Sequence, residues 1–129
     1  MAGDPYVIDH VSFAVGDLAR AKTFYVAALE PLGFGVAMEF PVAVGLGLPD
    51  RPQLWLQQGT PAGPIHIALH ARDEASVQAF HAAALAAGGS DNGGPGLRPQ
   101  YHPTYYAAYV KDLDGNNLEA VFHGGRPQP

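Results

Sequence analysis

The chain has 129 residues, no cysteine, a formal net charge of −5 and only seven Lys or Arg residues, none of them clustered. This composition argues against a nucleic-acid surface, which needs clustered basic side chains, and excludes disulfides and thiolate metal sites. A chain of this length is expected to form one domain. No segment approaches the roughly 20 apolar residues of a membrane span, so we expect the protein to be soluble and cytoplasmic.

The first half of the chain predicts a βαβββ unit over about residues 7–58. Alternating apolar side chains favour a strand over residues 7–15, and Asp17 caps a helical pattern that ends at Gly33. Three shorter extended segments follow, near residues 35–40, 42–48 and 53–57, and proline and glycine separate them.

The second half, about residues 65–123, predicts the same unit after a linker over residues 59–64. A strand over residues 65–71 leads to Asp73 as a helix cap and to a helix over about residues 74–87. The glycine-rich residues 93–96 are expected to form a loop, two strands follow it, and residues 124–129 are expected to be a mobile tail.

An internal duplication supports this division. His10 stands seven residues before Asp17, and His66 stands seven residues before Asp73. The same offset pairs Phe24 with Phe80 and Gly33 with Gly89. We therefore predict an α+β fold of two βαβββ modules related by a pseudo-twofold axis, with a curved mixed sheet and helices on its outer face.

Strand alternation predicts which side chains share a face, because successive side chains point to opposite sides. In each strand one face is apolar and suits packing against helices. The other face carries the residues with chemistry, and we expect it to line a pocket. These residues are His10, Ser12, Trp55, Gln57, His66, His70, Glu119 and His123.

Two imidazoles and one carboxylate on that face form a candidate metal site. His10, His66 and Glu119 would hold one divalent ion, Fe, Mn, Zn or Ni, with positions open for water or substrate. Trp55 occupies the place in the first copy that Glu119 occupies in the second, and an indole cannot coordinate. The alternative is that the three residues form only a hydrogen-bonded polar cluster.

The paired modules, the two histidine strand openings and Asp112-Leu-Asp-Gly-Asn-Asn-Leu-Glu119 resemble the vicinal oxygen chelate superfamily over about residues 7–123. That superfamily includes glyoxalase I, extradiol dioxygenases, fosfomycin-resistance enzymes and bleomycin-binding proteins. The resemblance implies that His10, His66 and Glu119 are the metal ligands and that the protein is a homodimer. Because glyoxalase I has a metal-binding glutamate where Trp55 stands, the chain departs from the glyoxalase I pattern.

Aromatic residues 101–109 supply further candidates. Tyr105 and Tyr109 are expected to face the pocket, where a phenol can donate a hydrogen bond and a ring can stack on a planar substrate. We predict Glu119, His102 and Tyr105 as catalytic residues. Substrate contacts are expected from Ser12, Trp55, Gln57, Tyr105 and Tyr109. His70 and His123 are expected at the pocket rim or surface, and His81, on a helix, at the surface.

The sequence therefore favours a metal-dependent enzyme of the glyoxalase or dioxygenase type. It would act on a small oxygenated or aromatic molecule that chelates the metal, as a glyoxalase-like lyase or isomerase or as a ring-cleaving dioxygenase. The alternative is a bleomycin-resistance-like protein that binds a small molecule without catalysis. Whether one chain or two build each site stays open at this stage.

Overall fold

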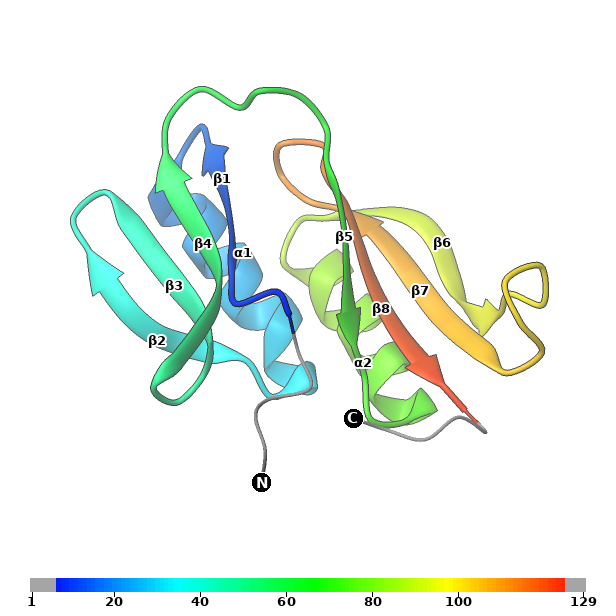
Figure 1. Cartoon of the computed structure of the whole chain (residues 1–129). Coiled ribbons are helices and arrows are strands. Elements are labelled where there is room, and N and C mark those ends of the chain that lie inside the picture. Colours follow the sequence, from blue (N-terminus) through cyan, green and yellow to red (C-terminus); the bar gives the residue numbers. More distant parts are fainter. Residues whose placement is uncertain (1–6, 125–129) are drawn as a thin grey trace.

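The computed structural model describes residues 7–124, in which two modules repeat one order of elements (Figure 1). The first module contains β1 (Val11–Val15), α1 (Leu18–Leu29), the 3-10 turn η1 (Glu30–Leu32), β2 (Gly35–Phe40), β3 (Ala43–Leu48) and β4 (Arg51–Gln58). The second contains β5 (His66–His70), α2 (Glu74–Ala86), β6 (Ser90–Leu97), β7 (Tyr105–Lys111) and β8 (Asn117–His123). Apart from Gly124, the expected mobile tail lies outside the described residues.

Each module forms its own four-stranded mixed sheet. The strand orders are β1-β4-β3-β2 and β5-β8-β7-β6. In each sheet the first strand of the module runs parallel to the last, and the remaining pairs are antiparallel. Figure 1 shows the two sheets side by side, with edge strands β1 and β5 facing each other. The predicted α+β fold of two βαβββ modules is confirmed, and the expected curved sheet consists of these two sheets.

The two helices begin where the sequence predicts. Oδ1 of Asp17 accepts a hydrogen bond from the backbone N–H of Arg20 at 3.1 Å. Oδ1 of Asp73 accepts one from the N–H of Ser76 at 2.7 Å, so both aspartates are N-caps. After α1, Gly33 takes a left-handed φ of 85° and ends η1. No helix in residues 7–124 is long and apolar enough to span a membrane.

One hydrophobic core joins the modules through their helices. Phe24 of α1 and Phe80 of α2 are almost fully buried, and the core also includes the inward side chains of both sheets. Gly89 leaves room for this packing, because a Cβ there would lie 2.6 Å from Cγ1 of Val110 and 2.9 Å from Cε1 of Phe24. The inward residues are those that alternation placed on the apolar faces, including Val15, Leu54, Leu56, Leu118 and Ala120.

Residues 93–96 do not form the expected loop. They belong to β6, the edge strand of the second sheet, which pairs antiparallel with β7. The pairing is irregular between Asp91 and Gly93 and between Gly93 and Gly96. An edge strand tolerates Pro95 and such bulges, because only one of its sides needs backbone partners. Pairing with β7 thus overrides the turn-forming tendency of the local sequence.

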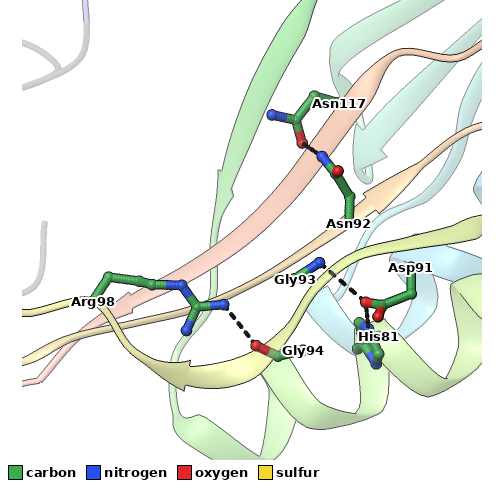
Figure 2. Close-up of polar contacts among 7 residues, drawn as sticks. All are labelled: His81, Asp91, Asn92, Gly93, Gly94, Arg98 and Asn117. Carbon is green, nitrogen blue, oxygen red and sulfur yellow. Dashed lines mark hydrogen bonds and ion pairs between the residues drawn. The ribbon is translucent and has the colours of Figure 1, made fainter.

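The expectation that His81 lies at the surface is also wrong. Its side chain is only 14% exposed, and Nε2 lies 2.9 Å from Oδ1 of Asp91 on β6 (Figure 2). The hydrogen bond from His81 is the main cause that lowers the pKa of Asp91. This pair attaches the glycine-rich edge strand to α2.

A buried carboxylate, Asp112, connects the modules through hydrogen bonds. The hydroxyl of Tyr25, on α1, donates to Oδ2 of Asp112, which is 6% exposed. Asn116 donates its backbone N–H to Oδ1 of Asp112 at 2.8 Å and its side-chain amide to Oδ2 at 2.9 Å. Oδ1 of Asn116 in turn accepts the N–H of Ile65, the residue before β5, at 3.0 Å.

We predict that Tyr25→Phe lowers the free energy of unfolding by about 1–3 kcal/mol, because it removes a donor from a buried carboxylate. Urea denaturation followed by circular dichroism measures the change. Tyr106→Phe is the matched control, since the Tyr106 hydroxyl meets Gln78 in an exposed hydrogen bond. We expect it to cost under about 0.5 kcal/mol. Equal losses in the two variants would contradict a special role for Asp112.

Candidate metal and ligand site

The candidate site lies on the face of the second sheet that points away from α2. Glu119 of β8 is its centre and is only 2% exposed, although its neighbours Leu118 and Ala120 pack into the core on the other face. Oε1 of Glu119 lies 3.0 Å from Nε2 of His66, and Oε2 accepts a hydrogen bond from the hydroxyl of Tyr105. Both oxygens of this buried carboxylate therefore have partners.

The second ring nitrogen of His66 defines the proton arrangement. Nδ1 lies 3.1 Å from the backbone carbonyl oxygen of Asn117. A carbonyl only accepts hydrogen bonds, so Nδ1 carries a proton. In a neutral His66, Nε2 then presents a lone pair to the Glu119 carboxylate, an unfavourable contact unless a cation lies between them. This backbone contact is the kind that orients metal-binding histidines.

Two tyrosines of β7 border the carboxylate. Tyr109 lies directly opposite Glu119 in the strand register, and its ring stacks on His66 with 6.4 Å between centroids and 25° between planes. Burial, followed by the charge of Glu119, raises the pKa of Tyr109 to about 12. Burial and the hydrogen bond to Glu119 likewise raise the pKa of Tyr105. Both phenols therefore stay protonated at neutral pH and can donate hydrogen bonds.

His102 is linked to this group indirectly. Its Nδ1 accepts the N–H of Thr104 at 3.3 Å, so Nε2 carries the proton and donates to Nδ1 of His123 at 2.9 Å. Its ring lies edge-on to that of Tyr105, with 5.4 Å between centroids. His102 thus contacts Tyr105, which contacts Glu119, and its role in proton transfer stays a prediction.

The substrate-contact residues predicted in the first module lie on the other sheet. Trp55 is opposite Ser12 in the register of β4 with β1, as Glu119 is opposite Ala68 in β8 with β5, so the duplication places Trp55 where Glu119 stands. Trp55 stacks on Phe40 with 6.0 Å between ring centroids. Ser12 and Gln57 are exposed on the same sheet.

The third predicted ligand lies apart from the other two. His10 precedes β1 and is exposed, and its Nδ1 lies 2.6 Å from Oδ1 of Asp9. Within residues 7–124, no group of three or more His, Asp or Glu residues is placed to hold a metal ion. One chain therefore brings His66 and Glu119 together and leaves His10 outside the group.

Sequence reasoning did not identify two contributors. Asn117 acts through its backbone carbonyl, which carries no residue-specific signal. Phe40 reaches Trp55 only because β3 lies between their strands and offers Gly45, where a Cβ would lie 2.9 Å from Cη2 of Trp55. The sequence did predict a strand at residues 35–40 and the face of β4 on which Trp55 lies, but it did not show that Phe40 and Trp55 would meet.

The described surface has several cavities. One of about 360 Å³ lies where the modules meet, between Asp9, Gln53 and His70. Another, of about 770 Å³, lies between α1 and the β2–β3 turn and includes none of the predicted site residues. The side-chain contacts around Glu119, rather than either of these cavities, therefore define the candidate site.

Residues 7–120 match the model of the Glyoxalase/Bleomycin resistance protein/Dioxygenase superfamily. No curated protein sequence matches the chain. This family match covers both modules and all of the strands discussed above except the end of β8.

Solved structures agree with the family match. A glyoxalase/bleomycin resistance protein from Albidiferax ferrireducens T118 is 30% identical, with 92% of this chain and 98% of that chain covered and a TM-score of 0.77. A glyoxalase-related enzyme from Fulvimarina pelagi is 19% identical, with 95% and 92% covered and a TM-score of 0.74. A lactoylglutathione lyase from Agrobacterium tumefaciens is 20% identical, with 92% and 95% covered and a TM-score of 0.67. At such identities the last two show the shared fold alone. The chain belongs to the glyoxalase/bleomycin resistance protein/dioxygenase superfamily.

Proposed function

We propose that the protein is a cytoplasmic, divalent-metal-dependent enzyme that acts on a small oxygenated or aromatic molecule. His66 and Glu119 would hold the metal together with His10 of the partner subunit in a homodimer. The observation that carries this proposal is the contact between Nε2 of His66 and Oε1 of Glu119, 3.0 Å apart with Nδ1 of His66 held by a carbonyl.

The geometry of this pair suits a shared ion. His66 and Glu119 lie close enough to hold one divalent ion together, since Nε2 of His66 is 3.0 Å from Oε1 of Glu119. A neutral His66 has its lone pair on the nitrogen that faces Glu119, and a cation between the two groups removes that unfavourable contact. Imidazole and carboxylate donors fit Fe, Mn, Zn or Ni.

A partner subunit can supply what one chain leaves incomplete. His10 is exposed near the start of β1, and apolar side chains are exposed on the same module: Met38 is 44% exposed and Phe40 is 52% exposed. Exposed apolar patches of this kind mark interaction surfaces. We place the second module of the partner over this surface, with Trp55 as one wall of the site.

The residues of the chain have defined tasks in this proposal. A bound metal would supply Lewis-acid chemistry that polarises oxygens of the substrate. Tyr105 would hold Glu119 in place with its single O–H, its hydroxyl oxygen would accept a hydrogen bond at the reacting centre, and His102 would exchange protons behind it. The rings of Trp55 and Tyr109 would flank a planar substrate, with Ser12 and Gln57 as polar contacts. A glyoxalase-like lyase or isomerase and a ring-cleaving dioxygenase both fit these roles.

A second candidate is a small-molecule binding protein without catalysis, as in bleomycin resistance. One observation favours it: both oxygens of Glu119 already have partners, His66 and Tyr105. A protonated His66 would make this a closed ion pair that needs no metal. Metal content separates the two candidates.

We predict close to one metal ion per chain in protein purified without chelators, measured by elemental analysis. His66→Ala and Glu119→Gln should each lose most of it, because two ligands remain in either variant. His70→Ala is the matched control, since it changes an exposed histidine of the same strand. Wild-type protein that stays metal-free after incubation with Fe, Mn, Zn and Ni would refute the enzyme proposal and favour the binding protein.

Subunit mixing tests where His10 acts. We expect His10→Ala and His66→Ala homodimers each to lack metal, whereas a purified heterodimer of the two variants should hold one ion. In that heterodimer, the intact His10 of one chain meets the intact His66 and Glu119 of the other. A heterodimer without metal, formed from folded chains, would contradict a site shared between subunits.

A further prediction follows from the tyrosines. Because the pKa of Tyr109 rises from 10.0 to about 12 on folding, its contribution to stability is complete below about pH 10 and is lost as the pH rises through about 12. Urea denaturation between pH 9 and 11 should therefore show a steeper loss of stability in the wild type than in Tyr109→Phe. Equal slopes would show that Tyr109 titrates normally in the folded protein.

A further inference from the structure

An arginine that follows the edge strand lies beside the candidate site. Cζ of Arg98 is 5.3 Å from the centroid of the Tyr109 ring, the same ring that stacks on His66. Nη2 of Arg98 donates to the carbonyl of Gly94 at 2.7 Å, so the guanidinium lies back along β6 (Figure 2). Arg98 and His66 therefore both contact the ring of Tyr109, which lies opposite Glu119 in the strand register.

The glycines of β6 make room for this guanidinium. A Cβ at Gly96 would lie 3.2 Å from Nη1 of Arg98. A Cβ at Gly93 would lie 3.3 Å from Nη2 and 3.0 Å from Cδ1 of Tyr109, and Gly93 also has a φ of +143°. Side chains at these two positions would crowd the arginine and the ring, so the glycine-rich sequence forms a seat for Arg98.

The seat is attached to the strand that carries Glu119. Nδ2 of Asn92 on β6 donates to Oδ1 of Asn117 on β8 at 3.3 Å, and His81 holds Asp91 from the side of α2 (Figure 2). β6 is therefore held from both faces of the sheet. A group with a fixed position can select a ligand without the entropy cost of ordering a long side chain.

The charge of Arg98 is not neutralised within the described chain. None of the ion pairs among residues 7–124 includes Arg98, whose hydrogen bonds go to the backbone carbonyls of Gly94 and Leu97. Arg98 is half-buried, and a guanidinium has five N–H donors in a planar fork. Donors therefore remain for an anion, and the fork matches a carboxylate.

We propose that Arg98 binds a carboxylate of the substrate, so that the substrate class is a small aromatic carboxylate. This inference rests on the proposed function, because it assumes that the ligand binds on the sheet face around Glu119. The ring of the ligand would lie near Tyr109, and its carboxylate would reach the fork of Arg98. A single guanidinium near the buried charge of Glu119 favours a monoanion over a phosphate dianion.

The test compares an acid with its amide. The probes are 3,4-dihydroxyphenylacetate and 3,4-dihydroxyphenylacetamide, titrated by calorimetry into wild-type protein and Arg98→Gln, each both metal-loaded and metal-free. The wild type should bind the acid about tenfold more tightly than the amide, the gain expected of a charge-assisted bidentate contact. In Arg98→Gln the two affinities should agree within about twofold, through loss of acid affinity alone.

Two further variants define the control and the geometry. Arg72→Gln removes an arginine whose side chain is 75% exposed before α2, and it should keep the wild-type preference for the acid. Arg98→Lys retains the charge without the fork and should keep only part of the preference. Thermal denaturation of each variant separates changes in binding from changes in folding.

The outcomes separate this proposal from the proposed function. An acid preference that depends on Arg98 supports the carboxylate site even in protein that holds no metal, whereas metal content alone decides the enzyme proposal. Equal acid and amide affinities in the wild type, or no binding of either probe in either form, would overturn the assignment. A fall in stability of Arg98→Gln with an unchanged acid preference would leave Arg98 as a structural clamp on β6 and would also overturn it.

Discussion

The placement of the candidate site depends on one buried carboxylate in the turn between β7 and β8. Asp112 accepts hydrogen bonds from Tyr25 of the first module and from Asn116, and Asn116 accepts the N–H of Ile65. The residue after Ile65 is His66, and the residue after Asn116 is Asn117, whose carbonyl orients the His66 ring. An unpaired buried carboxylate is very costly, so the partners of Asp112 are held in place, and with them the starts of β5 and β8.

The duplication produces two sheets of the same register with different chemistry. Where the second sheet has Glu119 beside Tyr109, the first has Trp55 beside Gly45. The first sheet thus has the indole of Trp55 in place of the carboxylate, and it has a glycine in place of the tyrosine. The indole occupies the space that a side chain at Gly45 would take. The second sheet thus presents hydrogen-bonding and ligating groups, and the first presents an aromatic wall. This division suits a site in which one surface performs the chemistry and the other holds the ligand.

Much of this arrangement could be predicted because it follows from local rules. Period-two alternation placed Leu54, Leu56 and Leu118 toward the helices, and Asp17 and Asp73 cap helices by contacts within three residues. The failures have long-range causes. β6 is a strand because β7 pairs with it, His81 is shielded because Asp91 reaches it, and Arg98 meets Tyr109 across the sheet. The internal duplication also predicts that His10 and His66 occupy equivalent positions in the two modules. It does not predict how far apart the two modules place them.

The way the modules pack within one chain supports the separation of His10 from its predicted partners. α1 and α2 cover the inward faces of both sheets and share a core in which Gly89 leaves room for Val110 and Phe24. That packing uses the helix faces, and within residues 7–124 no helix covers the opposite faces of the sheets. The apolar Phe40 and the half-exposed side chain of His66 therefore remain accessible, on different modules. A second copy that places its first module against this second module would cover both kinds of surface at once and bring a His10 toward Glu119. In a duplicated chain the helices can hold the two halves together while the ligand site forms between halves of different chains.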